Sequence, residues 1–375
     1  MYRVPRKKRY IGPVIALLLL ALLAVGVYGI VSLLSGTPDY AKSAILLPSN
    51  NPGVYPYADG VLTISERQMV CFDLQGKILW DANLPTDNMK AARLGKLTAV
   101  WGDVSGGGVV EILDEKGISI TVLNTVGSVV TVALSPSQYA VVTNEDGQPR
   151  MRLYNLNKEE PFDEVLFTDE QVLGVGFYGE KDKLTQLWTL FIDSHGTQPV
   201  TKLNTYYPGR STTGSIELDD EVGYKALLRD KTIYMLGTHT LSSWDHSGSK
   251  KSSKLVYGWY LQDMLVEDTG RVTYLLAPVG GAEDTTQISA LWSISSDGTE
   301  YKVPLPAGCI RAMLKADRSL VVATGNGVYS MAADGTRSRF HPVGFTIENI
   351  SAVVPGKAFV AQTKHGSYLL PMPSR

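Results

Sequence analysis

The residues able to do metal or nucleophilic chemistry are few and scattered along the 375-residue sequence. The five histidines form no i, i+4 pair and no motif with a carboxylate, so they do not predict a metal site. The two cysteines, Cys71 and Cys309, match neither a metal-binding nor a redox spacing. There is no G-x-S-x-G nucleophile motif and no phosphate-binding glycine loop. We therefore expect no enzyme, no cofactor and no metal, and two buried, unpaired thiols.

Aspartates recur shortly before glycines, as in Asp73 before Gly76 and Asp114 before Gly117. This arrangement could serve calcium, but no run matches the ligand spacing of a calcium-binding loop. An aspartate just before a glycine turn commonly bonds its own backbone and tolerates the geometry of the turn. We therefore predict a structural role for these carboxylates.

Charge and composition narrow the class of protein. The chain carries 35 Lys+Arg against 37 Asp+Glu, so it lacks the basic footprint of a nucleic-acid-binding domain. Its 36 glycines and 19 tyrosines, with frequent Val and Thr, favour strands and tight turns. The length suits one large domain or two ordinary ones.

The N-terminus has the pattern of a membrane anchor. Residues 1–10 are basic, and residues 11–34 are free of charge and almost wholly apolar. As a helix this stretch would be about 36 Å long, enough to span a hydrocarbon core of about 30 Å. The apolar run is too long for a typical signal peptide and lacks a clear cleavage site, although a cleaved signal remains the alternative. The basic flank predicts a single-pass plasma-membrane protein with a cytoplasmic N-terminus and an extracytoplasmic C-terminal part.

After a short linker over residues 35–42, the sequence shows short alternating or apolar runs separated by turn residues. This pattern is typical of all-β domains. The sharpest unit, residues 70–80, reads as a strand, a tight glycine turn and a second strand that ends in Trp80. Related hairpins follow at spacings such as 41 residues, from Gly76 to Gly117, and 37 residues, from Gly298 to Gly335. Periods near 40–50 residues indicate the blades of a β-propeller.

The Asp-x-x-Gly hairpin followed by a tryptophan, at residues 73–80, resembles the repeat of the PQQ-like and WD40-like β-propeller superfamily. The resemblance extends over residues 42–375 as a pattern. It implies the fold but not the activity, because such repeats serve enzymes, assembly factors and binding scaffolds alike. PQQ-dependent dehydrogenases of similar fold usually have an adjacent cysteine pair and a calcium site, and neither signal occurs here.

We predict an all-β, eight-bladed propeller of four-stranded blades over residues 43–375, preceded by the transmembrane helix. The last blade has only three strands of its own, and the strand 43–48 is predicted to complete it and close the ring. Residues 172–218 are the weakest blade, because either His195-Gly196 or Pro208-Gly209 could form its outer hairpin. A seven-bladed ring is therefore the alternative. The predicted blades span residues 54–84, 88–124, 129–167, 172–218, 221–260, 261–305, 309–344 and 348 to the C-terminus.

The short linker has a consequence for orientation. Eight extended residues reach roughly 27 Å, so the propeller must lie against the membrane. The face that carries the turns between first and second and between third and fourth strands should look toward the lipid, and it is modestly basic. The opposite face carries glycine-rich connections that we expect to be long and to bind a partner. Its candidate binding residues are Asp103, Glu145, Asp146, Asp193, Glu283 and Asp284.

These patterns favour a non-enzymatic, membrane-anchored binding or scaffolding protein of the cell envelope, with an unknown protein or envelope polymer as its partner. A degenerate propeller enzyme acting on an envelope polymer or glycan is the first alternative, and an envelope sensor is the second. The charges of the two faces could also be ordinary solvated turn residues, which is a further alternative. Carboxylates or histidines that converge at the central channel would favour the enzyme.

Overall fold

The computed structural model describes the chain from residue 40 onward, with a few short gaps. The predicted basic tail, the transmembrane helix over residues 11–34 and most of the linker lie outside the described residues. Within those residues, no helix is long and apolar enough to cross a bilayer. The described ranges are 40–48, 53–57, 60–180, 183–210, 212–218, 220–229, 231–278 and 287–373.

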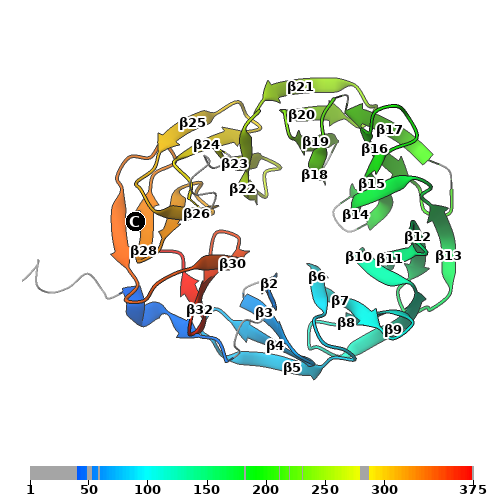
Figure 1. Cartoon of the computed structure of the whole chain (residues 1–375), viewed down its shortest axis with the longest axis horizontal. Helices are drawn as coiled ribbons and strands as arrows, with labels where there is room; N and C mark the ends of the chain where they lie inside the picture. The colour runs from blue at the N-terminus through cyan, green and yellow to red at the C-terminus, as the bar shows by residue number, and fades with distance from the viewer. Residues whose placement is uncertain are drawn as a thin grey trace, which may run out of the picture.

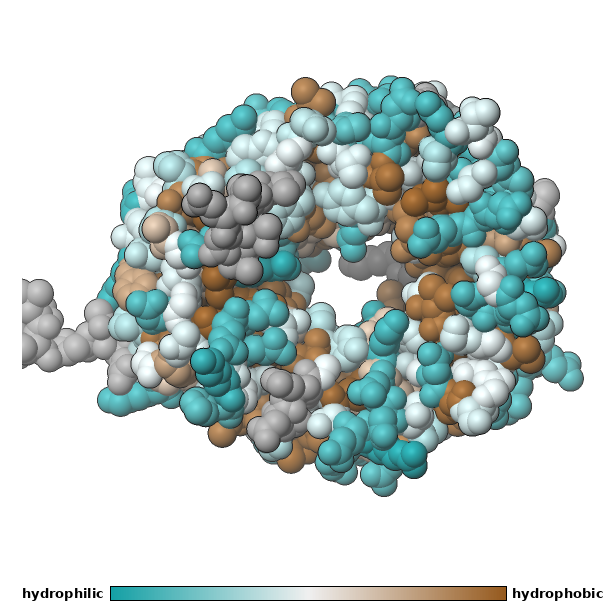
Figure 2. All heavy atoms as spheres, viewed as in Figure 1, coloured by the Kyte–Doolittle hydropathy of each residue, from teal (hydrophilic) through white to brown (hydrophobic). Residues whose placement is uncertain are grey.

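Eight four-stranded antiparallel sheets are arranged radially in a closed ring, as Figure 1 shows. In seven blades the four strands follow one another in sequence from the innermost to the outermost. The space-filling view in Figure 2 shows an open passage through the centre of the ring. The prediction of eight four-stranded blades is confirmed, and the seven-bladed alternative is wrong.

The first four blades lie close to their predicted boundaries. Their strands are β2 (Gly53–Tyr57), β3 (Gly60–Ser65), β4 (Gln68–Asp73) and β5 (Ile78–Asn83); β6 (Lys90–Leu94), β7 (Leu97–Val104), β8 (Gly107–Leu113) and β9 (Ser119–Val126); β10 (Ser128–Leu134), β11 (Gln138–Glu145), β12 (Gln148–Asn155) and β13 (Pro161–Leu166); and β14 (Glu170–Glu180), β15 (Lys183–Asp193), β16 (Val200–Tyr206) and β17 (Thr212–Leu218).

The remaining blades complete the circle. Their strands are β18 (Gly223–Arg229), β19 (Thr232–Gly237), β20 (Thr240–Asp245) and β21 (Lys250–Leu255); β22 (Trp259–Val266), β23 (Val272–Pro278), β24 (Ala290–Ser295) and β25 (Glu300–Pro304); β26 (Cys309–Leu314), β27 (Leu320–Thr324), β28 (Gly327–Met331) and β29 (Arg339–Pro342); and β30 (Asn349–Val354), β31 (Ala358–Thr363) and β32 (Gly366–Pro371), joined by η1 (Tyr40–Ser43) and β1 (Ile45–Leu46).

The sequence of a strand follows its place in the blade. A middle strand is covered by a neighbouring blade on each face, so it is largely apolar, as in β27, where all five residues are buried and only Thr324 is polar. The outermost strand of the fifth blade, β21, is instead polar and largely exposed. Lysines on such an edge discourage pairing with another chain.

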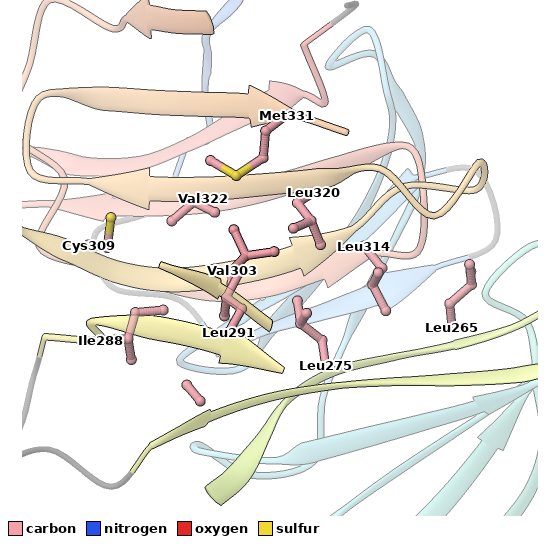
Figure 3. Close-up of a cluster of buried hydrophobic side chains, with 12 residues drawn as sticks. Leu265, Leu275, Ile288, Leu291, Val303, Cys309, Leu314, Leu320, Val322 and Met331 are labelled. Carbon is pink, nitrogen blue, oxygen red and sulfur yellow. The ribbon is translucent and has the colours of Figure 1, made fainter. Parts of the chain in front are cut away.

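The hydrophobic core lies between neighbouring blades. Figure 3 shows Leu275 and Leu291 of the sixth blade facing Leu314 and Leu320 of the seventh, and all four side chains are buried. Cys309 belongs to the same cluster, and Cys71 is buried between the first and second blades. Both thiols are free, as predicted, and burial raises the pKa of Cys71 to about 12 and that of Cys309 to about 11. These thiols therefore stay protonated and unreactive.

The N-terminal strand closes the ring, as predicted. Strand β1 pairs antiparallel with β32, with Ile45 opposite Leu369 and Leu46 opposite Tyr368. The backbone N–H of Leu47 extends this pairing by donating to the carbonyl of Ser367 at 2.9 Å. The strand is shorter than the predicted 43–48, because residues 40–43 form a 3₁₀ turn instead.

The repeated aspartates stabilise the outer hairpins. In the first blade, Asp73 Oδ1 accepts from the backbone N–H groups of Gln75 and Lys77, each at 2.9 Å. In the second blade, Asp114 Oδ1 accepts in the same way from Lys116 and Ile118. These bonds satisfy the backbone donors of a tight turn, which supports the structural role predicted for the aspartates over calcium binding.

One ambiguity of the predicted organisation is resolved, and two details are corrected. Pro208-Gly209 lies in the hairpin between β16 and β17, which resolves the ambiguity in the fourth blade. Residues 259–260 begin the sixth blade rather than end the fifth, because Trp259 pairs with Pro278 of β23. The segment 103–108 is not a long loop, since β7 and β8 extend through it and leave only Ser105 and Gly106 between them.

Candidate functional site

The predicted acidic residues lie on one face of the ring. Asp103, Glu145 and Asp193 stand at the ends of β7, β11 and β15, which are the second strands of three consecutive blades. Asp146 lies in the turn that follows β11. Glu283 and Asp284 lie outside the described residues, although the sequence places them in the same kind of connection, between β23 and β24. We name the face with the second-to-third-strand connections the acidic face.

Glu145 belongs to a network of charges on the third blade. Its carboxylate accepts from Arg152, and it lies 3.3 Å from Arg150 Nε and 2.8 Å from Thr143 Oγ1. Glu164 of β13 bridges the same two arginines, at 3.0 Å from Arg150 Nη1 and 2.9 Å from Arg152 Nε. The side chain of Glu145 is only 13% exposed, and the bond to Arg152 lowers its pKa. Glu145 therefore orders the sheet instead of standing free for a partner.

Replacing Glu145 with Gln should destabilise the protein in a pH-dependent manner. The folded-state pKa of Glu145 is lowered, so its contribution is present above the unfolded pKa of about 4.3 and is lost as the pH falls through the folded pKa. We expect Glu145→Gln to reduce the free energy of unfolding by about 1–3 kcal/mol at pH 7. The difference from wild type should shrink toward pH 2, as measured by denaturant titration.

Asp87→Asn is the matched control for this prediction. Asp87 pairs with Arg67 at 3.2 Å, but the two side chains are 57% and 68% exposed. Solvent screens such a pair, so we expect a change below about 1 kcal/mol. Equal losses for the two variants would show that the network on the third blade adds nothing beyond a surface ion pair.

A second cluster surrounds Asp193 on the fourth blade. Its carboxylate lies 2.6 Å from His195 Nδ1 and 2.8 Å from Lys202 Nζ. The bond to Lys202 and those to His195 lower the pKa of Asp193, and the same carboxylate raises the pKa of His195. Donor atoms of Glu170, Asp193 and His195 lie within 4.8 Å of one another, as in a metal site. We assign no metal here, because the ammonium group of Lys202 already provides the cation beside Asp193.

Asp146 and Asp103 are the exposed members of the acidic face. Asp146 lies in the left-handed region at φ 51°, which places its carboxylate at the tip of the hairpin between β11 and β12. Asp103 Oδ1 accepts from the backbone N–H of Val129 at 3.2 Å, which ties the second blade to the third. Three neighbouring blades therefore present carboxylates on a rigid frame, with Asp146 the one most open to a partner.

The central channel shows no convergence of acids and histidines in its described part. Among the described side chains of the eight innermost strands there is no histidine, and the carboxylates are Glu170 and Asp263. Asp263 accepts from the backbone N–H groups of Met264 and Leu314, at 2.8 and 2.6 Å, so it serves to join the sixth blade to the seventh. Burial raises its pKa, but these backbone bonds give the carboxylate a structural role.

Sequence reasoning missed the cavities between blades. One of about 270 Å³ lies between the fourth and fifth blades, and another of about 510 Å³ lies between the fifth and sixth. Basic residues of the fifth blade line both, including Arg229 and Lys231 in the first and Lys251 in the second. The strand pattern gave no sign that these residues would line cavities, because the opposite walls come from the neighbouring fourth and sixth blades. Residues 223–255 do carry a signal, however, with six Lys or Arg against two Asp.

Comparison with known proteins shows the fold alone. No family model and no curated protein matches the chain. Among solved structures, BamB from Moraxella catarrhalis aligns with a TM-score of 0.55 at 13% identity, over 88% of this chain and 97% of that one. The Dos1 propeller aligns with a TM-score of 0.57 at 9% identity, over 89% of this chain and 96% of that one. The WD40 domain of SCAP from fission yeast aligns with a TM-score of 0.56 at 9% identity, over 89% of this chain and 99% of that one. The chain thus has the β-propeller fold.

Proposed function

We propose that this chain is a membrane-anchored binding or scaffolding protein of the cell envelope, which acts without catalysis and engages its partner through the acidic face. The observation that carries the proposal is the gathering of Asp103, Glu145, Asp146 and Asp193 on one face of a closed ring. A rigid scaffold that presents polar connections from several blades is suited to binding. Its partner would be a protein or an envelope polymer with cationic groups.

The structure of the linker supports a short tether. Residues 40–43 are packed on the rim between the seventh and eighth blades, where Tyr40 donates to the carbonyl of Pro371 and its ring lies 5.6 Å from that of His341. If the transmembrane helix ends at residue 34, only residues 35–39 are free to extend. Five residues reach at most about 17 Å. This rim would therefore stand close to the lipid, with the turns between first and second strands toward the membrane and the acidic face directed away from it.

The ion pairs suggest how the acidic face works. Glu145 and Asp193 are held by Arg152 and Lys202, so they fix the shapes of their hairpins. The exposed carboxylate of Asp146 remains for a partner's cations, and the exposed carboxylate of Asp103 adds negative charge on the neighbouring blade. Contacts at such exposed charges chiefly raise the rate of association and weaken as salt is added.

Neutralising four of the candidate acids in the full chain should reduce partner capture. Photo-crosslinking in intact cells, with the photoreactive residue at position 148, would measure capture, and we expect a loss of about fivefold or more, equivalent to roughly 1 kcal/mol. Glu145 and Asp193 stay unchanged so that the hairpins keep their ion pairs. The substitutions are Asp103→Asn, Asp146→Asn, Glu283→Gln and Asp284→Asn.

The matched control removes four carboxylates from the opposite face. Its residues lie in turns between first and second or third and fourth strands, and all four are exposed. Unchanged capture after neutralisation of the acidic face would overturn the proposal, as would an equal loss in the control. The control substitutions are Glu115→Gln, Glu159→Gln, Glu160→Gln and Asp268→Asn.

A further inference from the structure

The fifth blade concentrates positive charge in a chain that has little of it overall. Residues 223–255 carry six Lys or Arg against two Asp, a formal net charge of +4, whereas the whole chain has −2. This blade lies three blades away from the one that β1 completes (Figure 1). A local excess of this size attracts anions over several ångströms.

The cavity of about 270 Å³ between the fourth and fifth blades opens beside these charges. Arg229 and Lys231 reach it from the turn between β18 and β19, and His246 reaches it from the hairpin between β20 and β21. Among the described residues, neither Arg229 nor Lys231 has a carboxylate within ion-pair distance. Asp230, between them in sequence, lies outside the described residues. The cavity therefore has cationic groups available for an anionic ligand.

The opposite wall of the cavity, formed by the fourth blade, bears hydroxyl groups. Tyr178, Thr205 and Thr213 line it, and Thr205 Oγ1 lies 2.9 Å from Thr213 Oγ1. Burial raises the pKa of Tyr178, and the hydroxyls of Thr205 and Thr213 interact with it. Leu203 and Ile216 add apolar surface to the lining of the cavity. Cations on one wall and hydroxyls on the other suit a ligand that carries a phosphate at one end and hydroxyl groups at the other.

The volume limits the size of the ligand. Pockets for drug-sized ligands measure about 300–1,000 Å³, so a cavity of about 270 Å³ holds a single small unit rather than an oligomer. We propose that the cavity between the fourth and fifth blades binds a polyol phosphate, with Arg229, Lys231 and His246 holding the phosphate and the hydroxyl wall holding the polyol. A glycerol phosphate group fits this description, whether it belongs to a soluble ester, a polymer unit or a lipid headgroup.

Calorimetry on the full chain in phosphatidylcholine nanodiscs tests this site, with sn-glycerol 3-phosphate as the probe and inorganic phosphate for comparison. Glycerol 3-phosphate should bind more tightly than inorganic phosphate, because only the ester reaches the hydroxyl wall. The double variant Arg229→Gln, Lys231→Gln should raise the Kd for glycerol 3-phosphate at least tenfold, and His246→Gln should raise it less. Thr213→Val should weaken the binding of glycerol 3-phosphate while leaving the Kd of inorganic phosphate unchanged.

The matched control is the double variant Lys116→Gln, Lys158→Gln. It removes two exposed cations from hairpins of the second and third blades on the same face of the ring. The control should keep the wild-type Kd. No binding of glycerol 3-phosphate to the wild type, or an equal loss in the control, would overturn the proposal. Thermal unfolding of each variant excludes a loss caused by misfolding.

A second set of nanodiscs distinguishes the source of the phosphate. If a lipid headgroup occupies the cavity, replacing a third of the phosphatidylcholine with phosphatidylglycerol should raise the apparent Kd of glycerol 3-phosphate severalfold, and Arg229→Gln, Lys231→Gln should abolish that competition. An unchanged Kd assigns the site to soluble or polymeric esters. These outcomes do not depend on the acidic face, so the two proposals fail or succeed separately.

Discussion

Replacing Leu47 with Asp is expected to open the ring and leave the chain largely unfolded at 37 °C. Leu47 is 2% exposed and packs with Val54, Phe72 and Leu369, which belong to the first and last blades. A carboxylate in this apolar cluster would have no partner, which costs several kcal/mol. Replacing Leu47 with Ala should itself lower the free energy of unfolding by about 2–5 kcal/mol, because it removes contacts with both neighbouring blades. Denaturant titration and thermal unfolding measure both effects.

Leu46→Asp provides an unusually close control. Leu46 is the neighbouring residue of the same strand, but its side chain is 56% exposed. The same charge placed there should change the free energy of unfolding by no more than about 0.5 kcal/mol. If Leu47→Asp were as mild as Leu46→Asp, then the contact between the first and last blades would not stabilise the ring.

The closure of the ring was predictable because it follows from counting strands. Residues 348 onward supply three strands, and an unpaired edge at each end of an open ring is unfavourable. A spare strand, residues 43–48, lay just before the first blade, so its pairing beside residues 366–372 could be foreseen, although the register of residues 45 and 46 with 369 and 368 could not. The 3₁₀ turn over residues 40–43 could not, since it depends on contacts of Tyr40 with the seventh and eighth blades.

The candidate acidic face was only partly predictable. Strand alternation placed Asp103, Glu145, Asp146 and Asp193 on one side, because hairpins between second and third strands all emerge there. The pairing of Glu145 with Arg152 was hidden, although they are only seven residues apart, since it requires the register of β11 against β12. Register sets which side chains meet across strands, and here it is fixed by a two-residue turn in which Asp146 and Gly147 both have positive φ.

The cavities between blades were not predictable from the repeat at all. A blade pattern describes contacts within a sheet, whereas Arg229 and Tyr178 come from different blades. Their approach depends on how closely the fourth and fifth sheets pack and on side-chain volumes along both. The net charge of each blade could be calculated from the sequence, because the calculation requires only the blade boundaries and not the contacts between blades.

The glycines of the segment 103–108 do not have the role that the sequence pattern predicted. A glycine-rich stretch predicted a long, adaptable connection, but Gly107 and Gly108 lie within β8 and pair with Val126 and Thr125. Strands β8 and β9 approach so closely there that a Cβ atom added to Gly107 would lie 2.0 Å from the carbonyl oxygen of Thr125. These glycines serve the contact between strands rather than the flexibility of a loop.

Gly107→Ala is therefore expected to be strongly destabilising. The added methyl group meets backbone atoms of Thr125, which cannot rotate aside as a side chain could, so the ladder between β8 and β9 must separate. We expect a loss of about 3 kcal/mol or more in the free energy of unfolding, at the upper end of the usual cost of overpacking. Hydrogen exchange should also accelerate at the backbone amides of β9, which would localise the damage to the second blade.

Gly196→Ala separates this effect from the general cost of removing a glycine. Gly196 lies in the connection between β15 and β16, on the same face of the ring, and its nearest neighbour to an added Cβ is the Gln198 carbonyl oxygen at 3.4 Å. That contact is ordinary, so we expect a change within about 0.5 kcal/mol. If Gly107→Ala behaved like Gly196→Ala, then β8 and β9 would be farther apart than described. The segment before β8 would in that case be an adaptable loop, and Asp103 would no longer be held in a fixed position on the acidic face.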